Sequence, residues 1–253
     1  KRYNVRFNTD IQLNRQFSGT LDLSLRRTDI KQPPSGAPYI FQFLRSNNAT
    51  NQAILSNGLY GEGNNGENPL ARAAIGGLYH EQNLMALLNL SVKYKPANFF
   101  WAEVNYAPRY SDPRVKIFSH IIQMYKSDFS KGLAIPGINS LSEQFSRSWY
   151  NNLRATVNFD KEVAPNHRLT VLAGVQQEDQ SDSYISAYRQ VFTFPDYQVI
   201  NSGNQLNQSN AGSATSWALR SAFGRLNYNY KEKYLFEANA RYDGSSRFAA
   251  GNK

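Results

Sequence analysis

Side chains that could carry out catalysis or hold a metal are few and widely separated in this sequence. The three histidines, His80, His120 and His167, have no partner at the His-x3-His spacing of a zinc site. The 253 residues include no cysteine, which excludes thiolate metal sites and cysteine nucleophiles. The nucleophile elbow, the P-loop and the dinucleotide-binding glycine pattern are absent as well. We therefore predict no catalytic residue, no cofactor and no metal, and expect that the protein is not an enzyme.

An acidic segment and a glycine-rich segment give weaker hints of ligand binding. Glu178, Asp179 and Asp182 miss the D-x-D-x-D-G spacing of a calcium loop, which favours a solvated acidic segment. Residues 58–66 are rich in Gly and Asn but lack the Lys of a phosphate-binding loop, which favours a flexible external loop. Neither segment predicts a binding site.

Aromatic and basic residues raise two further possibilities. Tyr39, Phe41 and Phe43 could stack on sugar rings, although packing within a short loop helix is the favoured interpretation. The net charge of +9 is compatible with nucleic-acid binding, but the 28 Lys and Arg residues are scattered singly and the densest group surrounds one turn within 225–233. We predict no nucleic-acid partner.

The elements that carry these residues are strands, and the clearest of them lie in the first thirty residues. Apolar side chains alternate there with polar ones before a turn at 16–18: Tyr3, Val5, Phe7, Ile11 and Leu13. The alternation resumes after the turn at Leu21, Leu23 and Leu25. A period of two over this length is typical of strands with one apolar face, so the segment predicts a hairpin.

The same hairpin recurs three times along the chain. The paired runs of alternating residues are 84–94 with 100–106, 149–159 with 169–175, and 216–230 with 234–242. The run 216–230 is irregular, because its apolar phase switches between Phe223 and Leu226. This switch predicts a β-bulge or a strand that leaves the membrane partway.

The connections are short within each hairpin and long between hairpins. The long ones cover about 30–82, 110–146 and 177–215. Short turns that alternate with long loops are typical of an outer-membrane barrel, whereas loops in soluble sandwiches rarely exceed about fifteen residues. No apolar run approaches the roughly 18 residues that a membrane helix needs. The sequence therefore predicts an all-β fold of about eight antiparallel strands, part of a transmembrane barrel.

The period of two also assigns each side chain to a face. The side chains expected to contact lipid are Leu88, Val104, Val157 and Ala238. The side chains expected to face the lumen are Glu103, Arg154, Glu237 and Arg241.

The end of the chain carries a family likeness. Arg225, Asn227, Tyr228 and Tyr230 form an R-x-N-Y-x-Y hairpin, which is followed by an R-x-D-G-S-S-R-F segment. This second segment contains Arg241, Asp243, Gly244, Ser245, Ser246, Arg247 and Phe248. The combination resembles the mid-barrel signature of SusC/RagA transporters. Weaker matches are Asn68-Pro69-Leu70-Ala71, His167-Arg168-Leu169 and Leu172-Ala173-Gly174.

The resemblance implies a barrel of about 22 strands with an amino-terminal plug, in the outer membrane of a Gram-negative bacterium. It also implies coupling to TonB through a part that this chain does not contain, and a SusD-like lipoprotein that covers the substrate. Residues 1–253 would then all belong to the barrel domain. The R-x-D-G-S-S-R-F segment is expected to end the last strand, and Gly244 is expected to allow a sharp turn there, at the outer rim of the barrel.

The expected function is active import of an oligosaccharide or a peptide. One alternative is a passive porin or a small eight-stranded barrel, and another is a secreted carbohydrate-binding β-protein. An eight-stranded barrel would have to close on itself, whereas residues 247–253 continue beyond the last predicted strand. We therefore expect that further strands flank both ends of this sheet.

Overall fold

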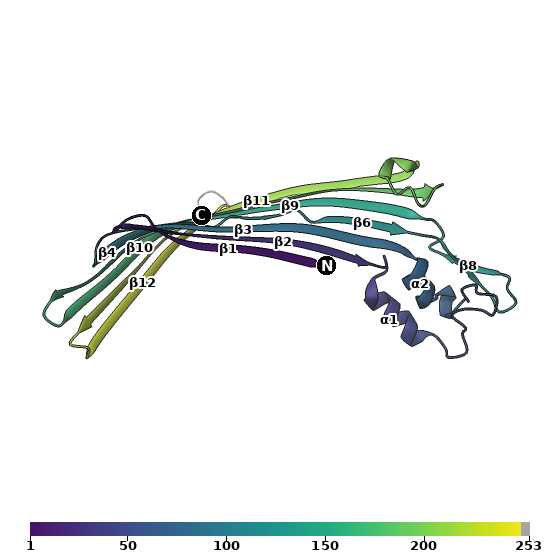
Figure 1. Cartoon of the computed structure of the whole chain (residues 1–253), viewed down its shortest axis with the longest axis horizontal. Helices are drawn as coiled ribbons and strands as arrows, with labels where there is room; N and C mark the ends of the chain where they lie inside the picture. Colours follow the sequence, from purple (N-terminus) through teal and green to yellow (C-terminus); the bar gives the residue numbers. More distant parts are fainter. Residues whose placement is uncertain (249–253) are drawn as a thin grey trace.

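The computed structural model describes residues 1–248, which form an arched antiparallel sheet (Figure 1). The long connections 33–76 and 120–139 form a lobe of short helices, short strands and loops at one end of this sheet. The hydrogen-bonded order is β1-β2-β3-β4-β9-β10-β11-β12, with β5 and β6 also lying between β3 and β9. All four predicted hairpins are present.

Ten strands fill eight positions in this sheet. Their bounds are β1 Arg2–Gln12, β2 Phe17–Gln32, β3 Gly77–Ala97, β4 Phe100–Tyr106, β5 Arg109–Ser111, β6 Arg114–Ser119, β9 Ser140–Ala164, β10 His167–Phe192, β11 Gly203–Tyr230 and β12 Tyr234–Ser245. The strands β4, β5 and β6 share one position because Pro108 and Pro113 fall in the two gaps between them. Proline has no N–H group for the ladder, so it interrupts the strand without displacing it.

The short turns lie together at the end of the sheet opposite the lobe (Figure 1). The turn between β11 and β12 is tight because Lys231 and Glu232 adopt φ angles of 53° and 55°. Two consecutive residues with positive φ match the twist of the flanking strands. The Lys231 N–H donates to the Asn166 carbonyl over 2.9 Å, which joins this turn to the neighbouring one.

The longer connections are shorter than the sequence predicts. They cover 33–76, 120–139 and 193–202, and most of the predicted loop 177–215 is strand. In that region β10 continues to Phe192 and pairs with β11 from Gly203 onward. Both faces of these extensions carry polar residues such as Ser183 and Ser213, so the sequence contains no alternation that would reveal them.

The register gives the sheet one polar and one apolar face. Residues that lie opposite one another share a face, and Glu103, Thr156, Gly174, Phe223 and Arg241 form one such row. The neighbouring rows, on the other face, carry mostly apolar side chains. The pairing of β11 with β10 is unbroken through Phe223 and Leu226, so the predicted β-bulge at this point is wrong. The alternative, a strand that leaves the membrane partway, stays a prediction.

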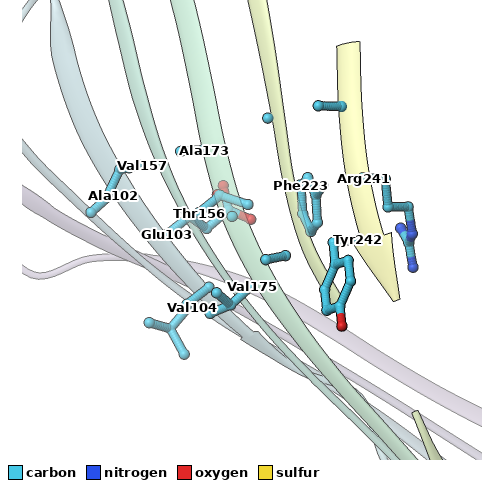
Figure 2. Close-up of a pocket in the computed structure, with 15 residues that line it drawn as sticks. Ala102, Glu103, Val104, Thr156, Val157, Ala173, Val175, Phe223, Arg241 and Tyr242 are labelled. Atoms are coloured by element: carbon cyan, nitrogen blue, oxygen red, sulfur yellow. The ribbon is translucent and has the colours of Figure 1, made fainter. Parts of the chain in front are cut away.

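The phase switch in β11 has a packing cause instead. Phe223 lies on the polar face against Gly174, and a Cβ on Gly174 would come within 2.5 Å of the Phe223 ring. The missing side chain of Gly174 therefore leaves the space that the ring occupies. Figure 2 shows Phe223 in this region beside Arg241 of the next strand, whose guanidinium carbon lies 5.7 Å from the ring centroid.

The apolar face forms a continuous band that runs diagonally across the strands. Val104, Val157 and Val175 are 49%, 45% and 58% exposed, although they are apolar. The band reaches Trp149 on β9, but on β10 it already ends at Val175, because Ser181 lies opposite Trp149. A level band that crosses strands on a diagonal means that the strands are tilted relative to it, as in a barrel wall.

The lobe is a small packed unit. It contains α1 Gly36–Ser46, η1 Asn64–Gly66, α2 Pro69–Ile75, β7 Ile122–Tyr125 and β8 Lys131–Ile135, while η2 Ile200–Ser202 lies at the β10–β11 tip. Ala71, Ile122 and Met124 are fully buried and pack with Tyr60 and Ile135. No helix in residues 1–248 is both long and apolar enough to cross a membrane.

The lobe also contains the segment that was expected to be a flexible loop. Gly66 is buried with a φ of 76°, and a Cβ there would lie 2.4 Å from the Leu133 side chain. The buried residue Asn68 accepts a hydrogen bond from Ala71 N–H and donates to the carbonyls of Ala53 and Gly61. Asn68-Pro69-Leu70-Ala71 is therefore a capped helix start that holds the glycine-rich segment in place.

Candidate functional site: the polar face of the sheet

The four residues predicted to face the lumen all lie on the polar face. Glu103 and Arg241 share a row, Arg154 lies in the adjacent polar row opposite Gln176, and Glu237 lies opposite Asn227. The four predicted lipid contacts lie on the opposite face. The structure does not gather Glu103, Arg154, Glu237 and Arg241 into one cluster, since β10 and β11 separate the first two from the last two.

A ladder of hydrogen bonds links β11 and β12 on this face. Arg225 Nε donates to Asn239 Oδ1 over 2.9 Å, and Asn239 Nδ2 donates to Glu237 Oε1 over 2.7 Å. The Asn227 amide, in the orientation that satisfies its neighbours, donates to the other Glu237 oxygen over 3.0 Å. Arg225 and Asn227 of the family segment therefore fix the position of a carboxylate on the polar face.

A second cluster surrounds Arg241. The Nε of Arg241 lies 2.8 and 3.0 Å from the two carboxylate oxygens of Asp243, and its Nη2 donates to Ser221 Oγ over 2.9 Å. The same guanidinium covers the Phe223 ring. Arg241 is thus held by three neighbours and presents an ordered charge on the polar face.

The two predicted residues on the other side of the face are less constrained. Glu103 lies opposite Lys93, whose ammonium group is 5.2 Å from the Trp101 ring centroid. In residues 1–248 the exposed Arg154 side chain makes no hydrogen bond, ion pair or ring contact. Arg154 is therefore available to a solute on this face.

An aromatic cluster that the sequence analysis missed lies nearer the lobe end of the same face. It is formed by Tyr150 and Trp217, whose ring centroids are 6.4 Å apart. The Arg109 guanidinium covers Tyr150 at 5.2 Å, and the Arg247 guanidinium covers Trp217 at 4.9 Å. Tyr150 also donates its hydroxyl to Glu178 over 2.8 Å. The signal was present in the parity of the strands, because Tyr150 and Trp217 fall on the polar positions of β9 and β11.

The remaining residues of the family segments have structural positions. Tyr228 and Tyr230 lie on the apolar face near the short turns, where His167 Nδ1 is 2.6 Å from the Tyr228 hydroxyl and Tyr230 stacks with Tyr234. Tyrosines at this level match the aromatic girdle of a membrane barrel. They do not belong to the polar site.

The R-x-D-G-S-S-R-F segment ends β12 without a glycine turn. Gly244 lies within β12 opposite Arg220 and has no positive φ, so the predicted sharp turn at this residue is wrong. The strand ends after Ser245, and Ser246 exchanges hydrogen bonds with Ala218 through its N–H and its Oγ. Phe248 is 60% exposed. The segment therefore brings Arg247 over Trp217 by means of Ser246 rather than Gly244.

The expected sugar-stacking residues lie in the lobe and are largely occupied by packing. Tyr39 donates its hydroxyl to Glu67 over 2.9 Å, and its ring lies 4.7 Å from Phe43. Only Phe41 is exposed, at 66%. The favoured interpretation of a packed loop helix therefore agrees with the structure for Tyr39 and Phe43.

A buried ion pair holds the lobe together. Arg72 contacts both carboxylate oxygens of Glu67, over 2.9 and 2.7 Å, and its guanidinium carbon lies 5.6 Å from the Tyr39 ring centroid. Burial raises the pKa of Glu67, but the hydrogen bonds from Arg72 and Tyr39 outweigh this effect and the pKa of Glu67 is lowered. Glu67 is thus an ionised structural group rather than a proton donor.

The polar face can recognise a solute, and its groups are suited to hydrogen bonding and stacking. In residues 1–248 no three His, Asp or Glu side chains are grouped so that they could hold a metal ion. The three histidines are dispersed: His80 lies in β3 within 3.2 Å of Asp29, and His120 packs on Phe118. Arginine-covered aromatic rings beside carboxylates suit a ligand rich in hydroxyl or amide groups.

Sequence comparison finds relatives that are all described as TonB-dependent receptors. The chain is 28% identical over 183 residues to TonB-dependent receptor P39 of Formosa agariphila, which is 72% of this chain and 17% of that protein. It is 29% identical over 110 residues to TonB-dependent receptor P26 of the same organism, which is 43% of this chain and 11% of that protein. No protein-family model matches the chain.

Structure comparison gives the fold. The chain superposes on the RagAB peptide importer in its closed-closed state with a TM-score of 0.76 and 16% identity, over 98% of this chain and 28% of the matched chain. The open-open state gives a TM-score of 0.75 over 99% of this chain and 28% of the matched chain. These matches confirm the predicted fold class, a partial antiparallel barrel. The chain spans less than a third of the length of each of these proteins.

Proposed function

We propose that this chain, which is similar to SusC/RagA-type TonB-dependent transporters, forms part of the wall of an outer-membrane barrel that imports an oligosaccharide or a peptide. The predicted resemblance to this group is confirmed by the relatives and by the fold. The observation that carries the proposal is the diagonal apolar band, opposite a polar face, across all eight strand positions.

The band supports a membrane location on physical grounds. A soluble protein rarely exposes so large a continuous apolar surface, whereas lipid covers it at no cost. Lipid also offers no hydrogen-bond partners, so the backbone at membrane depth must pair with neighbouring strands. All of residues 1–253 then belong to the barrel domain. The lobe and the connections within 30–82, 110–146 and 177–215 would project outside the cell, or lie on strands that extend there.

The polar face would line the route of the solute. The aromatic cluster and the ladder around Glu237 suit the hydroxyl groups of a glycan and the amide groups of a peptide equally well, so the substrate is proposed as one of these two classes. Energy coupling to TonB would use parts of the protein other than this wall. A SusD-like lipoprotein would contact the lobe, from which Phe41 and Leu44 of α1 project with 66% and 60% exposure.

Orientation can be tested with single cysteines, because residues 1–253 contain none. Ser56 in the lobe and Lys95 beside a short turn are both exposed. In intact cells Ser56→Cys should react with an impermeant maleimide, and Lys95→Cys should react only after the outer membrane is opened. The reverse pattern would invert the topology and remove the lobe from the lipoprotein contact.

Transport can be tested with a matched pair of tryptophans. Trp217→Leu removes a ring from the polar face, and Trp149→Leu removes one from the apolar face. Uptake of a labelled oligosaccharide or peptide should fall for Trp217→Leu alone, and wild-type uptake should stop in a strain without TonB. Uptake that persists without TonB would favour a passive porin. Recovery of the protein in the soluble secreted fraction would favour a carbohydrate-binding β-protein.

A further inference from the structure

Arginines occupy the first position beyond the apolar band on three separate strands. On β2 the outward residue after Leu25 is Arg27, on β9 the one beyond Trp149 is Arg147, and on β11 the one beyond Ala222 is Arg220. Residues two apart in a strand share a face. All three guanidinium groups therefore extend from the apolar face, at its border on the lobe side.

These arginines are unpaired, unlike Arg168 and Arg241 on the polar face. In residues 1–248 no hydrogen bond, ion pair or ring contact involves Arg27, Arg147 or Arg220, and all three are exposed. On the polar face, by contrast, Arg168 and Arg241 each contact a carboxylate at 2.8 Å. The border of the apolar band therefore carries cations that have no partner within residues 1–248.

The border is most developed around Arg147, where a groove lies on the sheet. Arg114, Phe145, Arg147 and Ile185 line it. Arg114 covers the Phe145 ring at 6.0 Å and is 60% exposed, and its contact with Asp112 is long, at 3.4 Å. Asp112 also lines the groove, so two arginines against one carboxylate leave it with a net positive charge.

The groove stands directly above interfacial aromatic side chains. Tyr110 and Trp149 pack edge to face at 5.4 Å, and Trp149 Nε1 donates to Asn151. Tryptophan and tyrosine mark the level at which acyl chains meet headgroups. Arg147 is the next outward residue, so its guanidinium lies at headgroup level.

The geometry points to a binding site for the phosphate of a lipid headgroup, formed by Arg147 and Arg114, with Arg27 and Arg220 extending the contact around the wall. The planar guanidinium offers paired N–H donors that match phosphate oxygens, and the apolar band below receives the acyl chains. This inference rests on the proposed function in one respect, namely that the lobe side faces the outer leaflet. The ligand would be a phosphorylated glycolipid of that leaflet.

A phosphate-binding site can be distinguished from arginines that are only solvated at the membrane surface. A solvated arginine would not distinguish a phosphorylated lipid from the same lipid without phosphate. A built phosphate site would, because each charge-assisted hydrogen bond contributes about 1.5–3 kcal/mol, which is roughly tenfold or more in affinity. The difference between these two lipids is therefore the measurement that decides.

The experiment uses the intact transporter purified in detergent and mixed with bisphosphorylated lipid A or with lipid A from which both phosphates have been removed. Native mass spectrometry counts the bound lipid. The double variant Arg114→Gln, Arg147→Gln should lose about tenfold in retention of the phosphorylated lipid. Arg154→Gln is the matched control, since Arg154 is on the same strand, is equally unpaired and lies on the polar face.

Three outcomes would overturn the inference. The first is that the phosphate-free lipid binds equally well, and the second is that the double variant retains the phosphorylated lipid fully. The third is that an equal concentration of inorganic phosphate displaces the lipid, which would identify a site for free anions. Heat-modifiable gel mobility verifies that each variant is folded. Because no step measures uptake, the lipid site can fail while transport stands. Conversely, the uptake test can fail while the lipid site stands, whereas a reversed cysteine-labelling pattern would place these arginines at the inner leaflet and overturn the inference.

Discussion

The band-crossing part of the sheet and the lobe use the same chain in opposite ways. In the sheet, Val104, Val157 and Val175 point outward and stay about half exposed, and the ladder of backbone hydrogen bonds holds the strands together. In the lobe, Ala71, Ile122 and Met124 are fully buried around a paired charge. The lobe is built like a small soluble protein, whereas we expect the sheet to be stable only when lipid and neighbouring strands cover it.

This contrast predicts where each region is vulnerable. Stability of the lobe depends on a few buried side chains, so a single substitution can open it. Stability of the sheet depends on its edges and on its apolar surface, so most substitutions on the polar face should be tolerated. Four measurements test this division, beginning with the largest expected effect.

Residues 1–253 expressed alone should not fold into a stable protein. In residues 1–248, β1 pairs only with β2 and β12 only with β11, so each outer edge carries a row of unpaired backbone groups. At membrane depth each unpaired group costs several kcal/mol, and the sum exceeds a usual net stability of about 5–15 kcal/mol. Residues 1–253 refolded into detergent should aggregate. A monomer with heat-modifiable mobility would show that these strands close unaided, and would favour the small-barrel alternative.

Breaking the buried ion pair should open the lobe and leave the sheet intact. Arg72→Leu leaves the Glu67 carboxylate buried without its partner, and such a change costs about 3–5 kcal/mol. Hydrogen exchange should rise in 33–76 and 122–135 and stay unchanged in β9 and β10. The control is Arg45→Leu, an exposed arginine of the same lobe. Equal exchange in the two variants would show that the lobe does not depend on this pair.

A charge placed on the apolar band should destabilise the barrel, and the same charge one residue further on should not. Val157→Arg should cost about 2–4 kcal/mol in the intact protein if Val157 contacts the membrane interior. Asn158→Arg introduces the same side chain on the polar face of the same strand and should cost little. Urea unfolding in lipid bilayers measures both. Similar losses for the two variants would contradict the assignment of faces.

Acid should loosen the lobe before it affects the sheet. Because the folded-state pKa of Glu67 is lowered, its contribution to stability is fully present above the ordinary glutamate pKa of about 4.3 and is lost as the pH falls through the folded value. Lobe protection against hydrogen exchange should therefore be constant at neutral pH and decline only below that range. In Glu67→Gln the decline should be much smaller; an unchanged acid response in that variant would assign the effect to another group.

The two regions also differ in how far the sequence predicts them. Alternation identifies every strand that crosses the band, because one face must be apolar and the other polar. The outer extensions of β10 and β11 escape prediction, since Ser183 and Ser213 show no contrast between faces. In the lobe, the segment 58–66 looked flexible because it is rich in Gly and Asn. Those glycines instead permit close contacts, such as that of Gly66 with Leu133, which only the tertiary structure reveals.

In the candidate site, too, the sequence predicts some features and misses others. Strand parity placed Glu103, Arg154, Glu237 and Arg241 on one face, and that placement follows from the period of two alone. Parity cannot show which of them meet, because the meeting depends on register between strands far apart in sequence. Tyr150 and Trp217 were missed because the alternation counts aromatic side chains with the apolar ones and assigns no role to an aromatic ring at a polar position. Their neighbours, two arginines and a carboxylate, make the polar face suitable for them.

The contact of Phe223 with Gly174 has a consequence for how the barrel is assembled. If β11 slid by two residues along β10, each side chain would keep its face and the hydrogen bonds could re-form. Phe223 would then lie opposite Leu172 or Gln176, either of which fills the space that Gly174 leaves open. Only the observed alignment places the ring opposite a residue that has no side chain. We therefore expect the Phe223–Gly174 contact to favour the native register of β11 on β10 over a two-residue slip during assembly.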